Sequence, residues 1–492
     1  MNIPNTKTLL LTGILPVTFS AAFTSCTNVN REETSPSNIL FIMVDDLRPD
    51  LNCYGNEKII SPNIDKLAKD GVLFERAYVQ QAICMASRAS LLTGYRANEH
   101  RIYSCLSVED LTPGVETLNR FFENNGYNVS AKGKIYHHKE DHLEQFGESW
   151  LIEGASEKIR GRGYITPEAQ AQIDENGRGP AWEIADVEDH EYADGYYARW
   201  AVEQIEKLKD SEEPFFLGVG FYKPHLPFNA PRKYWDMYDH ESISLTSQND
   251  YPENASDFGL HNFGELRNYT NTPTGNDPIP DDMARMLIHG YYACVSYMDA
   301  QVGIVMDALE ENGLKENTIV VFLGDHGWKL GDHAMWCKHT NFELDTRIPL
   351  IISGPGVKPN QKTNSFAEAL DIYHTLAELA GLQSPSHVQG NSLVPVLQNP
   401  ATSVKDAAFS IWPSYHGDRT DEEKVILGYS VRTDDFRYNE WIHLASDSLL
   451  GRELYDHRQN NREEINVIND PSVADFLPQL EERIDDYRKT LD

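Results

Sequence analysis

Unbroken apolar runs, each followed at once by polar residues, recur along the first part of the chain. Residues 38–44 (Asn-Ile-Leu-Phe-Ile-Met-Val) have the character of a β-strand that is buried on both faces. Similar runs predict further strands at residues 127–131, 215–221 and 318–323. Strands of this kind belong to parallel sheets, because only crossover connections cover both faces of a sheet with helices.

Between these runs, apolar residues recur with the spacing of helices that bury one face. Helices are predicted at residues 62–69, 117–124, 197–208, 283–312 and 367–380. The alternation predicts an α/β fold with a large, mostly parallel sheet covered by helices on both faces. In such sheets ligands bind beyond the carboxyl ends of the strands. Two stretches rich in Gly, Pro, Asn and Asp, 150–189 and 239–280, are interpreted as surface loops that shape a substrate pocket.

The pattern changes near residue 400. Short strands are predicted at residues 408–412, 426–432, 436–444 and 453–455, followed by a charged helix over about 473–491. This order predicts a smaller α+β domain with an antiparallel sheet. We therefore place a larger domain at residues 38–405 and a smaller one at 406–492. Two domains also suit the length, since single hydrophobic cores stop growing at about 250 to 300 residues.

The charge of the chain narrows the classes of partner. Among 492 residues, 43 Lys plus Arg stand against 76 Asp plus Glu, which gives a formal net charge of −33. Such an acidic chain is not expected to bind nucleic acid. An anionic substrate would need a local basic patch, for which Arg88, Lys134 and Lys338 are candidates.

The N-terminus has the pattern of an export signal. Lys7 precedes an apolar run over residues 9–23, which is too short for a comfortable membrane span, and small residues lead to Cys26. We interpret residues 1–25 as a signal peptide of lipoprotein type, Cys26 as the site of a lipid anchor and 26–37 as a polar tether. The alternative is a plain signal peptide. Either predicts export to the periplasm, and lipidation predicts anchoring at the bacterial outer membrane or cell surface.

Acidic residues follow two of the predicted strands. Asp45 and Asp46 come directly after residues 38–44, and Asp325 and His326 come just after the run at 318–323. Adjacent carboxylates in an apolar setting repel each other unless a cation or several donors compensate them. Three carboxylates with one imidazole favour a hard cation such as calcium or magnesium over structural zinc. For Asp45 and Asp46 alone, a helix cap or a turn is the alternative.

Cys84 stands before a helix that is predicted to begin near Ser87. A side chain there would lie at a helix N-terminus, which favours negative charge; the alternative for a lone cysteine is inert core packing. Lys134, His137 and His225 follow other predicted strands. The remaining cysteines have no CxxC spacing, and their pairing is left open: Cys53, Cys105, Cys294 and Cys337.

Residues 84–88 (Cys-Met-Ala-Ser-Arg), followed by 89–94 (Ala-Ser-Leu-Leu-Thr-Gly), resemble the signature of type I sulfatases of the alkaline-phosphatase superfamily. In that family a maturation enzyme oxidises the cysteine to formylglycine (3-oxoalanine), and alanine is an accepted alternative to proline at the third position. The resemblance covers most of the mature chain, through residues 38–46, 126–137, 223–225, 324–338 and 453–456. Residues 133–137, 223–228, 325–328 and 428–433 are nearest in style to the iduronate-2-sulfatase-like subgroup.

The resemblance implies a role for each matching residue. One Ca²⁺ per chain would be bound by Asp45, Asp46, residue 84, Asp325 and His326. Arg88 and Lys134 would hold the formylglycine oxygens, and His137 would take a proton during release of sulfate. His225 and Lys338 would grip the sulfate, with His225 as proton donor to the leaving alcohol. Hydrated formylglycine would attack sulfur and then expel sulfate, whereas an ordinary serine or cysteine would stay trapped as a stable ester.

These features predict a sulfatase that acts on sugars of a sulfated polysaccharide or its oligosaccharides. The expected source is a marine algal polymer such as ulvan, or iduronate 2-sulfate in a glycosaminoglycan. One alternative is a phosphonate or phosphate monoester hydrolase of the same superfamily; a phosphatase would be expected to carry serine or threonine in place of Cys84. Another is a non-catalytic glycan-binding lipoprotein, against which the complete set of catalytic positions argues. Trp328, His333 and Trp336 are predicted to contact sugar or to pack in the core.

Overall fold

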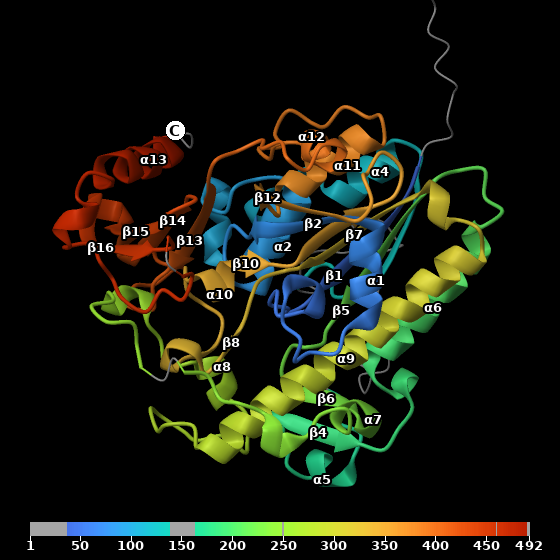
Figure 1. Ribbon diagram of the computed structural model, residues 1–492, viewed down its shortest axis with the longest axis horizontal. Helices are drawn as coiled ribbons and strands as arrows, with labels where there is room; N and C mark the ends of the chain where they lie inside the picture. The colour runs from blue at the N-terminus through green and yellow to red at the C-terminus, as the bar shows by residue number, and fades with distance from the viewer. Residues whose placement is uncertain (1–36, 138–162, 248–249, 459, 490–492) are drawn as a thin grey trace, which may run out of the picture. The chain divides into compact units, whose positions relative to one another are not determined.

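The computed structural model describes residues 37–137, 163–247, 250–458 and 460–489 (Figure 1). The predicted signal peptide, Cys26 and nearly all of the tether lie outside the described residues. Within them, no helix has the length and apolar character needed to cross a membrane. The described cysteines are all free thiols: Cys53, Cys84, Cys105, Cys294 and Cys337.

A mixed sheet of eight strands organises the larger part of the described chain, in the order β10-β2-β11-β7-β1-β5-β3 with β12 beside β2. Its strands are β1 Asn38–Val44, β2 Gly71–Tyr78, β3 Asn128–Gly133, β5 Phe215–Phe221, β7 Thr318–Gly324, β10 Arg347–Ile348, β11 Leu350–Ser353 and β12 Gln361–Glu368. The neighbours β3, β5, β1 and β7 run parallel, and β11 is antiparallel to β7. The predicted fold class is confirmed.

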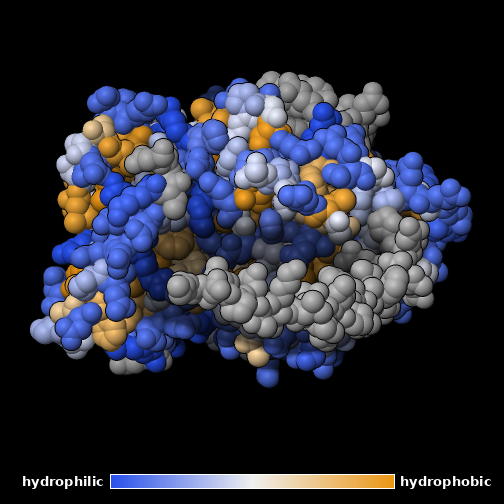
Figure 2. Space-filling view, turned by 90° about the horizontal axis from the view of Figure 1, so that it is seen from above, coloured by the Kyte–Doolittle hydropathy of each residue, from blue (hydrophilic) through white to orange (hydrophobic). Residues whose placement is uncertain are grey.

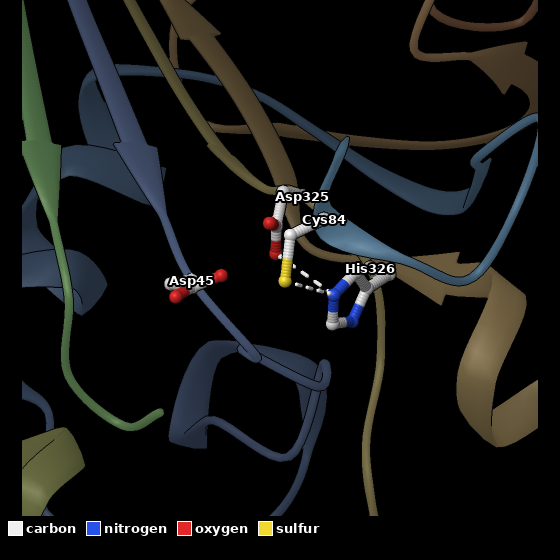
Figure 3. A group of neighbouring side chains, drawn as sticks. All are labelled: Asp45, Cys84, Asp325 and His326. Carbon is white, nitrogen blue, oxygen red and sulfur yellow. Dashed lines mark hydrogen bonds and ion pairs between the residues drawn. The ribbon is translucent and has the colours of Figure 1, made fainter. Parts of the chain in front are cut away.

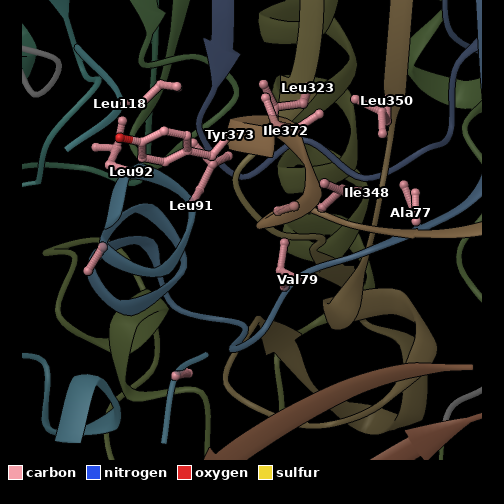
Figure 4. Packing of buried hydrophobic residues seen from close by; sticks show 14 of the residues in the cluster. Ala77, Val79, Leu91, Leu92, Leu118, Leu323, Ile348, Leu350, Ile372 and Tyr373 are labelled. Carbon is pink, nitrogen blue, oxygen red and sulfur yellow. The ribbon is translucent and has the colours of Figure 1, made fainter. Parts of the chain in front are cut away.

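Helices cover both faces of this sheet (Figure 1). They are α1 Pro62–Asp70, α2 Cys84–Thr93, α4 Leu118–Asn124, α6 Ala193–Leu208, α9 Asp281–Glu311 and α11 Asp371–Leu379. In β1, Phe41 belongs to a hydrophobic cluster that includes residues of α2, α4 and α11. Figure 4 shows part of this cluster. The next residue, Ile42, belongs to a second cluster, with residues of α1, α6 and α9. Every second residue faces the opposite core, which is why the strand is apolar throughout.

A second, antiparallel sheet follows in the sequence, with the order β13-β14-β15-β16. Its strands are β13 Ala408–Pro413, β14 Ile426–Arg432, β15 Phe436–His443 and β16 Ser448–Asp456. Helix α13, Leu477–Lys489, packs on it, and the ring of Tyr487 stacks on Phe409 with centroids 4.6 Å apart. This sheet shares a hydrophobic cluster with one face of the main sheet. The boundary at residues 405 and 406 stays a prediction.

The predicted starts of three helices were wrong. The predicted helix at 367–380 begins only at Asp371, because residues up to Glu368 pair with β2 as part of β12. Helix α2 begins at Cys84 instead of near Ser87. The predicted C-terminal helix begins at Leu477.

The two predicted loops contain short regular elements. Strand β4, Trp182–Ala185, pairs with β6, Phe228–Pro231, and a short helix, α8, spans Gly264–Arg267. Trp328, His333 and Trp336 are at most 5% exposed, so they pack in the interior. The hydropathy colouring of Figure 2 shows a largely hydrophilic face, in keeping with the acidic composition.

Candidate active site

Polar residues from sequence-distant segments meet where the parallel strands end. Asp45 follows β1, Asp325 follows β7, Lys134 follows β3 and His225 lies beyond β5. The backbone N–H of Asp46 donates to Asp325 Oδ1 at 3.0 Å, which ties two of these strand ends together. The carboxyl ends of adjacent parallel strands share one edge of the sheet, so the sequence positions predicted this meeting.

Asp45, Cys84, Asp325 and His326 form a compact group of metal-ligand type (Figure 3). One ligand atom from each lies within 4.8 Å of the others, and a second, overlapping group adds Asp46 and His225. Cys84 Sγ is 3.2 Å from His326 Nε2. His326 Nδ1 faces the carbonyl of Gly327 at 2.9 Å; a carbonyl can only accept, so Nε2 is the nitrogen left for a ligand. All the predicted metal ligands lie in these two overlapping groups.

Cys84 is the first residue of α2 and is only 3% exposed. Ser87 Oγ donates to the carbonyl of Asp325, which fixes the start of the helix against the end of β7. Burial, reinforced by the charge of Asp45, raises the pKa of the Cys84 thiol well above its usual value. The unmodified side chain is therefore a neutral thiol and a poor nucleophile.

Arg88 and Lys134 bring positive charge to the buried carboxylates. Arg88 Nε donates to Asp325 Oδ2 at 2.9 Å, and its Nη2 lies 3.4 Å from Asp45 Oδ1. Lys134 Nζ donates to Asp45. Burial opposes ionisation of Asp45, but Lys134, with smaller contributions from His225 and Arg88, holds its pKa well below the usual value. Both cations are ordered by these contacts and reach the surroundings of Cys84.

Lys338 and His225 lie together on another side of the group. Lys338 Nζ donates to Asp46 Oδ1 at 2.9 Å and to Glu265 Oε1 at 3.0 Å. His225 Nε2 is 3.3 Å from Glu265 Oε1, and its Nδ1 contacts the carbonyl of Leu226. Burial opposes ionisation of Glu265, but Lys338 and His225 lower its pKa to about 2.

Sequence reasoning missed Glu265. It lies on α8, inside the stretch interpreted as a loop, and a single acid in such a segment carries no recognisable pattern. It also missed Asp194 of α6, which accepts the backbone N–H groups of Tyr222 and Lys223, each at 2.8 Å, and so fixes the segment that leads to His225. His137 is half-buried beyond β3, next to residues outside the description, and its role stays a prediction.

The donor set fits a hard divalent cation. Asp45, Asp46 and Asp325 are all buried, and burial raises the pKa of Asp46 above its usual value, against the pull of Lys338 and with the help of Asp45. Negative charge at Asp46 is thus not fully offset by the side chains present. Carboxylate oxygens with one imidazole suit calcium or magnesium better than zinc.

A further group of metal-ligand type, Glu343, His457 and Glu463, lies at the antiparallel sheet. Arg437 donates to both carboxylates at 2.7 Å, and Arg432 lies 3.2 Å from Glu343. Since guanidinium groups already compensate these charges, we assign the group to structure.

Comparison with known proteins settles the family. A family model described as Sulfatase matches residues 37–382, and one described as N-sulphoglucosamine sulphohydrolase, C-terminal, matches residues 331–490. The chain belongs to the sulfatase family. Membership of this family makes the protein a sulfuric ester hydrolase. The resemblance to type I sulfatases of the alkaline-phosphatase superfamily predicted this activity.

Several relatives of this sulfatase are named for sulfated sugars or a sulfated polysaccharide. Iduronate 2-sulfatase of Mus musculus is 32% identical over 91% of this chain and 93% of its own length, and that of Homo sapiens 31% over 96% and 98%. Ulvan-active sulfatase of Formosa agariphila is 28% identical, over 79% of this chain and 72% of its own.

Among solved structures, phosphonate monoester hydrolase from Silicibacter pomeroyi has a TM-score of 0.73 at 22% identity, covering 93% of this chain and 96% of its own. At that identity the likeness shows the shared fold alone.

Proposed function

We propose that this sulfatase removes sulfate esters from oligosaccharides that contain uronic acids, with formylglycine formed from Cys84 and with one bound Ca²⁺. The observation that carries the proposal is the position of Cys84, buried at the start of α2 with Sγ among carboxylates and 3.2 Å from His326. Iduronate 2-sulfatases, similar over almost the full length of both chains, support the uronate substrate. Both candidate substrates, iduronate 2-sulfate in a glycosaminoglycan and the sulfated sugar of ulvan, are sulfate esters in polymers that contain uronic acids.

The proposed chemistry divides among the residues around position 84. The formylglycine hydrate supplies two hydroxyls on one carbon, one to attack sulfur and one to expel sulfate afterwards. Asp45, Asp46, Asp325 and His326 would hold Ca²⁺, which supplies Lewis-acid stabilisation of negative charge. Arg88 and Lys134 would donate hydrogen bonds to the oxygens at position 84.

His225 and Lys338 serve the substrate side. The Nδ1 atom of His225 contacts the carbonyl of Leu226, so Nε2 is the ring nitrogen that faces the site. In its doubly protonated form His225 would donate the Nε2 proton to the leaving alcohol, and Lys338 Nζ would hold a sulfate oxygen. His137 is proposed to accept the proton of the second hydroxyl when sulfate is released.

The test of formylglycine uses protein produced with a formylglycine-generating enzyme. Mass spectrometry of the peptide that carries residue 84 should show an aldehyde in place of the thiol. Cys84→Ala should abolish hydrolysis of an aryl sulfate, whereas Cys294→Ala, which removes another buried free thiol, should retain it. An unmodified thiol together with undiminished turnover in Cys84→Ala would refute the proposal.

The substrate is tested separately. The enzyme should release sulfate from defined iduronate 2-sulfate disaccharides or from ulvan oligosaccharides. Hydrolysis of aryl sulfate without release from either panel would reject the uronate substrate and leave the sulfatase assignment intact. Rates on matched aryl phosphonates should be much lower; the reverse preference would favour the phosphonate hydrolase alternative that the shared fold suggests.

We also propose that the protein is exported and lipid-anchored through Cys26, in the periplasm or at the outer membrane or cell surface. The N-terminal pattern of an apolar run and small residues before Cys26 supports this. Mass analysis of the mature N-terminus should find a lipidated cysteine at position 26. Cleavage at another residue would contradict it.

A further inference from the structure

A cluster of four rings lies beside Lys338. We call it the ring cluster, and its members are His261, His339, Trp412 and Tyr415. The ring of His339 stacks on Trp412 with centroids 5.3 Å apart and an interplanar angle of 25°. Tyr415 lies 5.8 Å from both Trp412 and His261. The ring cluster therefore unites the segment after β9 (Trp336–Cys337), the 239–280 stretch, and β13 with the loop that links it to β14.

The ring cluster borders the proposed sulfate contacts. His339 directly follows Lys338 in the sequence, and its Nε2 lies 3.8 Å from Glu265 Oε2. The same Glu265 carboxylate contacts both Lys338 and His225. A sugar whose sulfate reaches Lys338 would accordingly extend toward these rings.

Two rings of the cluster, Trp412 and Tyr415, differ strongly in their exposure to solvent. Trp412 is 1% exposed, whereas Tyr415 is 57% exposed. Leaving an aromatic ring in water forgoes favourable burial, so an exposed tyrosine supported by a buried tryptophan is suited to receive an apolar surface. The C–H face of a pyranose ring offers such a surface, and the phenolic hydroxyl can bond to sugar hydroxyls.

A guanidinium stands four residues further along the same loop. Arg419 is half-buried and makes no ion pair with a carboxylate in the described part of the chain. The acids next to it in sequence are engaged elsewhere: Asp418 accepts from Thr420, and Asp421 pairs with Lys424. The pKa of His339 is lowered by burial first and then by Lys338 and other cations, among which is Arg419.

We propose that Tyr415 and Arg419 form the subsite for the uronate ring of the substrate, with Tyr415 against the sugar face and Arg419 paired with the ring carboxylate. The inference rests on the proposed function and specifies how the uronate is read. Arginine suits this role because its planar guanidinium can donate two parallel hydrogen bonds to one carboxylate. In a chain with a net charge of −33, a cation without a carboxylate partner here supplies local attraction for a second anionic group of the substrate.

The first experiment compares Arg419→Gln with wild type on three substrates: an iduronate 2-sulfate disaccharide, the same disaccharide with its uronate carboxyl reduced to an alcohol, and an aryl sulfate without a carboxylate. For the uronate, kcat/KM should fall about tenfold to hundredfold, mainly through KM, since hydrogen bonds to charged groups contribute about 1.5 to 3 kcal/mol. The other two substrates should change less than about threefold. Arg199→Gln, on the exposed face of α6, is the matched control and should alter none of them.

The second experiment separates the ring from the hydroxyl. Tyr415→Ala should raise KM for both disaccharides by about fivefold or more, and Tyr415→Phe should retain most of the affinity because the ring face remains.

The outcomes are distinguishable. If wild type cleaves the uronate substrate and Arg419→Gln cleaves it equally well, or loses all three substrates alike, the subsite is rejected while the proposed function stands. If wild type cleaves aryl sulfate but neither the disaccharides nor ulvan oligosaccharides, both the uronate substrate and the subsite are rejected.

Discussion

Lys338, which is buried, and Glu265, which is half-buried, form an ion pair in which Nζ lies 2.9 Å from Oε2. The same ammonium group lies 2.9 Å from Asp46 Oδ1, so it links the metal-ligand group to helix α8. In our proposal, Lys338 donates a hydrogen bond to a sulfate oxygen of the substrate. Glu265 then competes with that anion for the same donor, and its charge repels an incoming sulfate at short range.

We expect Glu265→Gln to bind inorganic sulfate more tightly. The substitution keeps the size and a carbonyl acceptor but removes one negative charge beside Lys338, so the inhibition constant of sulfate should fall about three- to tenfold. Product inhibition of aryl sulfate hydrolysis measures it. Glu241→Gln, an exposed acid in the same stretch of chain, is the control. Weaker inhibition in Glu265→Gln would show that the carboxylate assists sulfate binding by holding Lys338.

Removal of the proposed Ca²⁺ should lower both activity and thermal stability. A cation that binds only the folded state stabilises it in proportion to the logarithm of its concentration. Dialysis against a chelator should lower the melting temperature, and added Ca²⁺ should restore it in a concentration-dependent way. Asp325→Asn should lower metal content below one ion per chain. Asp299 is another buried acid, and it accepts the N–H groups of Asn63 and Ile64. As the control, Asp299→Asn should retain the metal. Full metal content in Asp325→Asn would exclude this site.

Asp194 should matter for activity although it is outside the predicted set. Its carboxylate accepts the N–H groups of Tyr222 and Lys223, so Asp194→Ala leaves both donors without their acceptor. We expect kcat to fall about tenfold or more because His225 loses its placement, and stability to fall by about 1 to 3 kcal/mol. Asp186→Ala, which removes an exposed acid shortly before α6, serves as control. Unchanged kcat in Asp194→Ala would mean that other contacts place His225.

The residues at the ends of buried strands were the predictable part of the site. The runs before Asp45 and Asp325 are apolar on both faces, and a polar cluster after such a run stands out in the sequence. Cys84 was found differently, through the resemblance carried by the residues around it, since a lone cysteine gives no local signal.

Tertiary pairing accounts for what the sequence did not reveal. Residues 361–365 are all polar, so no apolar pattern marks the strand that forms where they pair with β2, and the end of the stretch was assigned to a helix. Glu265 and Arg419 lie in segments without periodicity. The role of Glu265 follows from Lys338, which approaches it from far away in the sequence.

The buried charges at the antiparallel sheet should couple stability to pH. Arg437 donates to Glu343 and Glu463 at 2.7 Å each. Burial opposes ionisation of both acids, but Arg432 and Arg437 hold the pKa of Glu343 below its usual value of 4.5, and Arg437 does the same for Glu463. A carboxyl with a lowered folded pKa stabilises the protein above its unfolded pKa, and this stabilisation is lost as pH falls through the folded value.

Arg437→Leu should therefore be destabilised by about 3 to 5 kcal/mol near neutral pH, because two buried carboxylates lose their shared cation. Below about pH 4.5 the two carboxyls can protonate in the variant, which relieves the cost of burying their charge. In the wild type, the stabilisation from the ionised carboxylates begins to be lost over the same range. The difference between the two melting temperatures should therefore narrow. Arg452→Gln breaks an exposed pair with Glu481 on the same sheet and should cost no more than about 1 kcal/mol at either pH. A gap that widened on acidification would mean that the network stabilises the sheet through packing of the Arg437 side chain and not through its charge.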